Sequence, residues 1–181
     1  IYFRVNSVKE YGALSKQKID DLVSGSRIDV SDKKENPLDF ALWKLTDDDG
    51  IKFDTEIGTG RPGWHTECVV MVNSVFHKPL IDIHGGGFDL KFPHHENEIA
   101  QSEGSFSAEE RAEGPWVKYW LHNEFLVIEG GNKMSKSSGN FLRLQTLLDK
   151  GYDALDYRFF LLGGHYRKQI YFSWDAMDGA K

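Results

Sequence analysis

Residues 80–104 read LIDIHGGGFDLKFPHHENEIAQSEG, and they carry the clearest structural pattern in the chain. The compact apolar run 80–83 is typical of a strand buried in a parallel sheet. The three glycines at 85–87 predict a turn directly after that strand. Pro93 suits the first position of a helix that continues to about Ser102. Strand, glycine turn and helix in this order predict part of an α/β layer structure.

The segment before this stretch predicts a second helix. Its residues recur at i, i+3, i+4, i+7 and i+8, a helical spacing formed by Cys68, Met71, Val72, Val75 and Phe76. Pro79 is expected to end this helix because proline cannot continue the hydrogen-bond ladder.

The segments after residue 104 extend the pattern. Residues 116–128 contain strand-like apolar stretches, and the glycines at 130–131 predict a turn. Leu155, Phe159 and Leu162 form one face of an amphipathic helix, which the glycines at 163–164 are expected to end.

Residues 1–50 are more polar and weakly patterned. Residues 1–5 predict a strand and residues 19–23 one or two helical turns. Residues 38–43 follow Asn36-Pro37 and are interpreted as a short apolar helix. Residues 47–50, which read DDDG, predict a turn.

Composition limits the class of protein. The 181 residues are 40% hydrophobic and 28% charged, which is typical of a folded chain. The 22 Lys and Arg against 28 Asp and Glu give a net charge of −6, which excludes a protein that coats nucleic acid through general basicity.

The sequence contains no apolar run of about 20 residues, so we expect no membrane span. A single cysteine suits a reducing cytoplasm. Because Ile1 is not an initiator methionine and no secretory pattern follows it, we expect the chain to be part of a longer one.

The run 93–98, which reads PHHENE, suggests a metal site. A helix that begins at Pro93 places His94 and Glu98 at i and i+4, on one face. Cys68 could add a thiolate from elsewhere in the fold, and thiolate, imidazole and carboxylate are all zinc ligands. The alternative is that Cys68 is a small buried hydrophobe and that the His/Glu row is only a polar helix end. Spacing alone leaves both open, since the H-E-x-x-H order of zinc proteases is absent.

Three further motifs bear on nucleotide binding. His84, Gly85, Gly86, Gly87 and Asp89 come at the carboxyl end of the predicted strand, where open α/β sheets bind ligands and an acidic side chain can bond a ribose hydroxyl. A tight structural turn is the alternative.

Residues 58–63 match G-x-G-x-x-G, but no strand precedes them and Pro62 removes an N–H, so we discount a dinucleotide site there. Residues 133–137, KMSKS, offer two lysines and two hydroxyls suited to triphosphate oxygens. Composition alone does not distinguish such a loop from solvated surface.

Taken together, these strings resemble a known family. KMSKS at 133–137 is a signature of class I aminoacyl-tRNA synthetases, and GRPGWHTEC at 60–68, residues 82–104 and KMSKSSGNF at 133–141 closely resemble the cysteinyl-tRNA synthetase family. Residues 36–44 and 163–177 also look like that family. The resemblance covers nearly the whole chain in register.

The resemblance implies a set of site residues. Cys68, His94 and Glu98 would be three of four protein ligands of a zinc ion that binds the sulfur of the substrate cysteine. Trp64 would lie beside the bound amino acid. The catalytic lysines would be Lys133 and Lys136, with Lys136 contacting ATP and Lys133 assisting. The adenylate would be held by His84, Gly85, Gly86, Gly87 and Asp89. His65 and His95 would either orient the ligands or be satisfied polar residues, and these two options stay open.

The resemblance also implies a reaction and an architecture. A cysteine–tRNA ligase activates L-cysteine with Mg²⁺-bound ATP and transfers it to the terminal adenosine of tRNA(Cys), in the cytoplasm and as a monomer. The implied α/β fold is the second half of a class I Rossmann-like catalytic domain, at 58–122. It would follow part of a connective insertion at 1–57 and precede the KMSKS loop and the start of a stem-contact region at 123–181.

The family's HIGH-type motif, its fourth zinc ligand and its anticodon-binding region are expected to lie outside this chain, so we expect the chain alone to be inactive. Two alternatives remain, a mycothiol-pathway cysteine ligase and a non-catalytic tRNA- or partner-binding module. A zinc hydrolase is disfavoured because no general-base glutamate is placed as in H-E-x-x-H.

Overall fold

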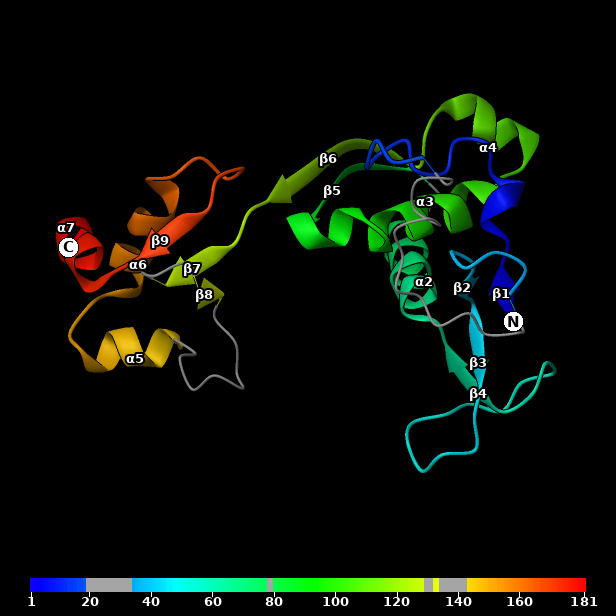
Figure 1. Cartoon of the computed structure of the whole chain (residues 1–181), viewed down its shortest axis with the longest axis horizontal. Coiled ribbons are helices and arrows are strands. Elements are labelled where there is room, and N and C mark those ends of the chain that lie inside the picture. Colours follow the sequence, from blue (N-terminus) through cyan, green and yellow to red (C-terminus); the bar gives the residue numbers. More distant parts are fainter. Residues whose placement is uncertain (19–33, 78–79, 129–131, 134–142) are drawn as a thin grey trace. The chain divides into compact units, whose positions relative to one another are not determined.

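The computed structural model describes residues 1–18, 34–77, 80–128, 132–133 and 143–181. The chain divides into two compact units, and Figure 1 labels their elements. The first unit contains Ile1–His84 and Asp89–Trp120, and the second contains Gly85–Phe88 and Leu121–Lys181. The predicted helical turns at 19–23, the turn at 130–131 and Lys136 lie outside the described residues. The domain boundaries implied by the resemblance stay a prediction.

Short antiparallel strands begin the first unit. Strand β1 (Tyr2–Phe3) pairs with β2 (Phe40–Ala41), and β3 (Trp43–Leu45) pairs with β4 (Gly60–Pro62). The strand predicted at 1–5 is therefore confirmed at Tyr2–Phe3 and wrong at Val5, and the short helix predicted at 38–43 is wrong.

The buried carboxylate of Asp39 explains that difference. It accepts hydrogen bonds from the backbone N–H groups of Val5, Glu35 and Asn36, at 3.0–3.2 Å. The bond from Val5 ties residue 39 to the N-terminal segment, and those from Glu35 and Asn36 fix the turn before it. Together they favour an extended path over a helical one. A 3-10 turn, Val5–Ser7, follows β1.

The glycines of the G-x-G-x-x-G string serve backbone packing. A Cβ atom on Gly60 would lie 2.2 Å from the carbonyl oxygen of Lys44, and one on Gly63 would lie 1.8 Å from that of Ala41. Both positions therefore require glycine for steric reasons. Residues 60–62 form β4 themselves, a context different from the strand-turn-helix order of a dinucleotide site.

Two neighbouring helices form the centre of the first unit. Helix α2 (Trp64–Phe76) packs against α3 (His94–Gly104), as Figure 1 shows. Both predicted helices are confirmed, and α2 begins four residues before the first residue of the predicted pattern. It ends ahead of Pro79, at His77 in the left-handed conformation. A short helix, α4 (Ala108–Glu113), follows α3 and begins with a Ser107–Glu110 capping box.

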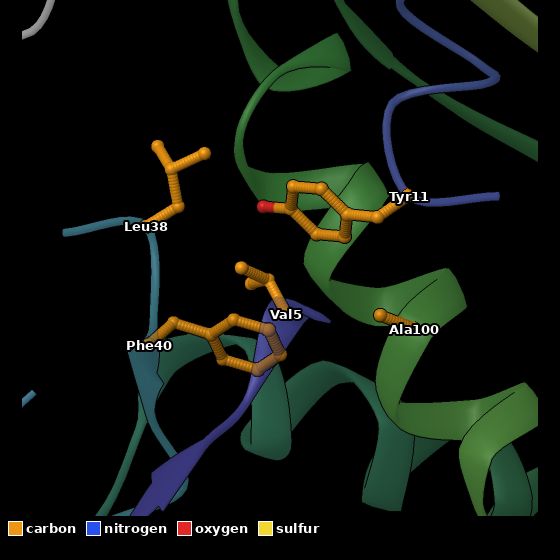
Figure 2. Close-up of a cluster of buried hydrophobic side chains, with 5 residues drawn as sticks. All are labelled: Val5, Tyr11, Leu38, Phe40 and Ala100. Carbon is orange, nitrogen blue, oxygen red and sulfur yellow. The ribbon is translucent and has the colours of Figure 1, made fainter. Parts of the chain in front are cut away.

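Two apolar clusters hold these elements. Val69, Ile81, Trp116 and Val117 form one, in which Val69 is the buried residue of α2. The other gathers Val5, Tyr11, Leu38 and Phe40 near Ala100 of α3, as Figure 2 shows.

Strand β5 (Ile81–Gly87) pairs with β6 (Val117–Asn123). The glycine turn predicted at 85–87 is wrong, because these glycines are the last three residues of β5, with no positive φ angle among them. The expected burial holds at Ile81, which is 6% exposed, and fails at Ile83, which is 61% exposed. Both side chains lie on one face of β5, and in the described part of the chain the apolar cluster with Val69 and Trp116 includes Ile81 and not Ile83. A 3-10 turn, Phe88–Lys91, leads on to α3.

The second unit has its own small sheet and core. Strand β7 (Leu126–Ile128) pairs antiparallel with β8 (Asn132–Lys133) and parallel with β9 (Ile170–Phe172). The unit also contains helices α5 (Leu144–Asp149), α6 (Ala154–Leu162) and α7 (Trp174–Ala180). Leu147, Phe172 and Met177 form the buried core of the unit. The strands predicted at 116–128 are confirmed.

The helix predicted around residues 155–162 is also confirmed, but its apolar face is not covered in the described part of the chain. Leu155, Phe159 and Leu162 are 66–73% exposed, and α6 ends at Gly163 as expected. None of the helices described here is long and apolar enough to cross a membrane.

Candidate metal centre

Helices α2 and α3 bring three predicted ligands together. The Sγ atom of Cys68 lies 3.6 Å from Nε2 of His94, and Oε1 of Glu98 lies 3.0 Å from the same nitrogen. All three ligand atoms lie within 4.8 Å of one another. His94 and Glu98 occupy one face of α3, one turn apart, while Cys68 comes from α2.

The first five residues of α3 are all polar and all buried. His94, His95, Glu96, Asn97 and Glu98 are each at most 5% exposed. Such side chains are rarely buried unless each has a partner. Glu96, which the sequence did not single out, accepts hydrogen bonds from the backbone N–H groups of Gly12 and Ser15 and from the Ser15 hydroxyl. It therefore anchors the N-terminal segment on α3. In the sequence, only its position between the predicted ligands His94 and Glu98 could have drawn attention to Glu96.

One oxygen of Glu98 is free to take a further ligand. Oε2 accepts a hydrogen bond from Nε2 of His84 at 2.8 Å. Oε1 is buried and makes no hydrogen bond, although it lies close to His94. Burial raises the pKa of the Glu98 carboxyl, but the bond from His84 and the proximity of His94 outweigh it and lower the pKa to about 2.

An ionised, buried carboxylate with an unbonded oxygen, beside a thiol and an imidazole, fits a zinc ion. These are the sulfur, nitrogen and oxygen donors that zinc takes in proteins. Burial raises the pKa of the Cys68 thiol to about 11, and the negative charge of Glu98 adds to this. A metal at this site would have to displace the thiol proton, which is the usual coupling of zinc binding to proton release.

Histidines surround the three ligands. Nδ1 of His65 lies 2.8 Å from Nδ1 of His94, and Nε2 of His65 lies 3.0 Å from Nδ2 of Asn97. Burial and the neighbouring His94 lower the pKa of His65 to about 4, so this imidazole is neutral at pH 7. The direct contact with His94 supports the ligand-orienting option for His65.

His95 and His84 form a second group with Glu98. Their ligand atoms lie within 4.8 Å of one another, and the ring of His95 lies 4.8 Å from that of His84 and 4.9 Å from that of Trp120. His84 already bonds Oε2 of Glu98 and leaves Oε1 beside His94. We therefore interpret this second group as support for the first and not as a second metal site.

Trp64, the first residue of α2, lies against one of the three predicted ligands. Its ring centroid is 4.2 Å from that of His94, and its side chain is 57% exposed. The expected place of Trp64 beside a bound amino acid stays a prediction.

The residues predicted to hold ATP are less defined. His84 bonds Glu98, Gly85–Gly87 complete β5, and Asp89 lies in the 3-10 turn after it. Lys133 belongs to β8, and Lys136 lies outside the described residues. The nucleotide-binding roles of these residues stay predictions.

Comparison with known proteins extends over the whole chain. The family described as the catalytic domain of tRNA synthetases class I (C) matches residues 1–181. The chain is 49% identical over 181 residues to the cysteine–tRNA ligase of Halalkalibacterium halodurans and 47% identical over 184 residues to that of Treponema denticola. It is 50% identical over 182 residues to the same enzyme of Nitratidesulfovibrio vulgaris strain Hildenborough. Each match covers 100% of this chain but only 36–37% of the relative, so the chain spans just over a third of their length.

Proposed function

This chain belongs to the family of class I (C) tRNA synthetase catalytic domains, and from that premise we propose that its protein joins L-cysteine to tRNA(Cys) at the expense of ATP. The identity of about half the residues with cysteine–tRNA ligases supports the proposal. The observation that carries it is the group of Cys68, His94 and Glu98, in which His94 and Glu98 are buried and Cys68 is half-buried.

The proposal assigns amino-acid recognition to a zinc ion held by these three side chains and by a fourth protein ligand outside this chain. When bound, zinc would supply a soft Lewis acid that favours a thiolate over a hydroxyl. L-serine, which differs from L-cysteine by oxygen in place of sulfur, would then be a poor substrate. A site that needs one particular substrate group discriminates far better than a small apolar pocket does, so no editing step is required. Trp64 would cover the amino acid once its sulfur is in place.

The proposed chemistry needs no protein nucleophile. The carboxylate of cysteine attacks the α-phosphorus of Mg²⁺-ATP, the bond to the bridging oxygen breaks, and pyrophosphate leaves. The 2′-hydroxyl of the terminal adenosine of tRNA then attacks the carbonyl carbon of the adenylate, and AMP leaves. Positioning and charge stabilisation account for catalysis of this kind. We assign adenylate binding to His84, Gly85–Gly87 and Asp89, and the developing charge on pyrophosphate to Lys136 with help from Lys133.

We also propose that residues 58–122 are the second half of a Rossmann-like catalytic domain. On this proposal residues 1–57 belong to a connective insertion, and residues 123–181 hold the KMSKS loop and the start of a stem-contact region. The span of just over a third of the relatives' length supports an incomplete ATP site in these 181 residues. We therefore expect no activity from them alone.

ATP–pyrophosphate exchange with the full-length protein tests the proposal. Exchange should depend on L-cysteine and should not occur with L-serine, and radiolabelled cysteine should be transferred to tRNA(Cys). Lys136→Ala should slow the exchange without changing the affinity for tRNA, whereas Lys52→Ala, at an exposed position, should change neither. Cysteine-dependent exchange by residues 1–181 alone would contradict the proposal that these residues hold only part of the ATP site.

The choice of acceptor separates the remaining alternatives. Transfer of cysteine to glucosaminyl-inositol and not to tRNA would identify a mycothiol-pathway ligase. Binding of tRNA without any exchange would identify a non-catalytic module.

A further inference from the structure

A line of hydrogen bonds runs from His94 away from the proposed zinc ligands. It passes from Nδ1 of His94 to His65, from His65 to the side-chain amide of Asn97, and from Asn97 to the hydroxyl of Tyr11. Asn97 is 2% exposed and Tyr11 is 6% exposed, so water does not compete freely for these groups. Figure 2 shows the Tyr11 ring beside α3, with its hydroxyl oxygen drawn in red.

The direction of each hydrogen bond follows from the donors and acceptors available. The Tyr11 hydroxyl donates to Oδ1 of Asn97, so the NH₂ group of that amide faces Nε2 of His65. Nε2 of His65 must then accept, and a neutral imidazole carries its one proton on the other nitrogen. His65 therefore donates from Nδ1 to Nδ1 of His94.

The direction of these hydrogen bonds decides which nitrogen of His94 carries the proton. A neutral His94 that accepts at Nδ1 carries its own proton on Nε2. Nε2 is the nitrogen that lies 3.6 Å from Cys68 Sγ and 3.0 Å from Glu98 Oε1. A protonated Nε2 has no lone pair for a metal, so this tautomer does not bind zinc through Nε2, the nitrogen that faces the other two ligands.

Zinc at Nε2 requires every bond in the line to reverse. His94 must donate from Nδ1 to His65, and His65 must donate from Nε2 to an acceptor. Of the two ends of the Asn97 amide, only the carbonyl oxygen can accept, so the amide must rotate by about 180°. The Tyr11 hydroxyl then faces the NH₂ group and loses the acceptor that it has in the structure.

We propose that Tyr11, Asn97 and His65 are positioning residues that set which nitrogen of His94 carries the proton, with rotation of the Asn97 amide switching His94 into its zinc-binding tautomer. This inference rests on the zinc site of the proposed function. Because the rotation takes the hydrogen-bond acceptor from the Tyr11 hydroxyl, Tyr11 lowers the free energy gained on zinc binding although it is not a ligand.

Asn97→Asp is the most informative variant. A carboxylate accepts from both the Tyr11 hydroxyl and Nε2–H of His65, so the zinc-binding tautomer forms without loss of a hydrogen bond. Zinc affinity should rise by about tenfold, roughly the value of one net hydrogen bond. Tyr11→Phe removes the demand for an acceptor and should raise zinc affinity by a few-fold. A merely structural role for either residue would lower the affinity instead.

A charge control and a direct readout accompany these variants. Gln101→Glu adds a carboxylate one turn along α3 from Asn97, outside the line, and should leave the tautomers of His65 and His94 unchanged. Long-range ¹H–¹⁵N NMR of full-length protein labelled at histidine, stripped of metal and held at pH 8, reports the protonated nitrogen of each ring. In the wild type, His94 should change from Nε2–H to Nδ1–H when Zn²⁺ is added, and His65 should change from Nδ1–H to Nε2–H. In Asn97→Asp both rings should hold the second tautomer before zinc is added.

The same spectra can overturn the proposal. A wild-type His94 that carries its proton on Nδ1 both before and after zinc would do so, as would weaker zinc binding by both Asn97→Asp and Tyr11→Phe. Melting curves of the variants establish that each is folded. If the tautomers exchange as described but cysteine-dependent pyrophosphate exchange is absent, the relay is supported and the proposed function is wrong.

Discussion

The beginning of α3 and the face of α6 have the opposite burial from the one that their hydrophobicity suggests. Five polar residues, His94 to Glu98, are at most 5% exposed, whereas the apolar Leu155, Phe159 and Leu162 are at least 66% exposed. Both helices were predicted correctly, α3 from Pro93 at its start and α6 from the spacing of its apolar residues. Periodicity therefore indicates where a helix forms, while its burial depends on the partners that each side chain finds.

The partners explain the burial at α3. Glu96 accepts three hydrogen bonds, Asn97 bonds Tyr11 and His65, and Glu98 bonds His84. The oxygen of Glu98 left without a hydrogen bond points to the chemistry of the site, since an unbonded buried oxygen is costly unless another ligand binds it.

The largest expected effect tests whether the buried end of α3 is built around a metal. Cys68→Ser replaces a thiolate ligand with a hydroxyl, and should lower the zinc affinity of the full-length protein by roughly 100- to 1000-fold. That figure follows from sharing roughly 10–16 kcal/mol of zinc-binding free energy among four ligands. Competition with a chromophoric chelator measures the affinity.

Glu67→Gln, at an exposed position on α2 next to Cys68, is the matched control and should change zinc affinity less than about threefold. Equal zinc content in Cys68→Ser and the wild type under chelator would remove Cys68 from the ligand set.

The next test compares two leucines of the second unit that differ in burial. Leu147 on α5 is 1% exposed, and Leu155 on α6 is 68% exposed. Leu147→Ala should lower the free energy of unfolding by about 3 kcal/mol, because it leaves a cavity in the core. Leu155→Ala should change it by less than about 0.5 kcal/mol. Urea denaturation of full-length protein compares the two, and a similar loss in both would mean that the α6 face is covered in the full-length protein.

These two helices also show how much the sequence could predict. The i, i+4 relation of His94 and Glu98 follows from helical geometry, so two ligands could be selected from sequence alone. The approach of Cys68, 26 residues earlier, depends on the packing of α2 against α3, so the residues alone left its role open and the family resemblance selected it as a ligand. The long-range bonds of Asp39 and Glu96 leave no local pattern, so the strand at 40–41 and the anchoring role of Glu96 were missed. Residues 85–87 were misjudged because glycine permits an extended strand as readily as a turn.

A smaller effect is expected at Glu96, which anchors the N-terminal segment on α3 and is not a proposed zinc ligand. Glu96→Gln keeps one carbonyl oxygen but turns an NH₂ group toward either the N–H of Gly12 or the N–H and hydroxyl of Ser15. Loss of charged hydrogen bonds should cost about 2 kcal/mol in the free energy of unfolding. Glu109→Gln, at an exposed position on α4, should cost almost nothing. Equal stability of both variants in urea would show that Glu96 does not anchor residues 12–15.

The smallest effect is expected at His84, which bonds Glu98 from outside the ligand set. His84→Phe removes that hydrogen bond and should weaken zinc binding by about 10-fold, as is common for partners that orient a ligand. His84→Gln retains a donor and should restore most of the affinity. If the glutamine and phenylalanine variants bind zinc equally well, the hydrogen bond does not orient Glu98.

X-ray absorption at the zinc edge of the full-length protein, with and without substrate, tests the central claim most directly. If Cys68, His94 and Glu98 hold zinc in order to recognise a thiol, L-cysteine should add one sulfur neighbour at about 2.3 Å from the metal, and L-serine should add none. A zinc environment that L-cysteine leaves unchanged while ATP–pyrophosphate exchange proceeds would contradict the account.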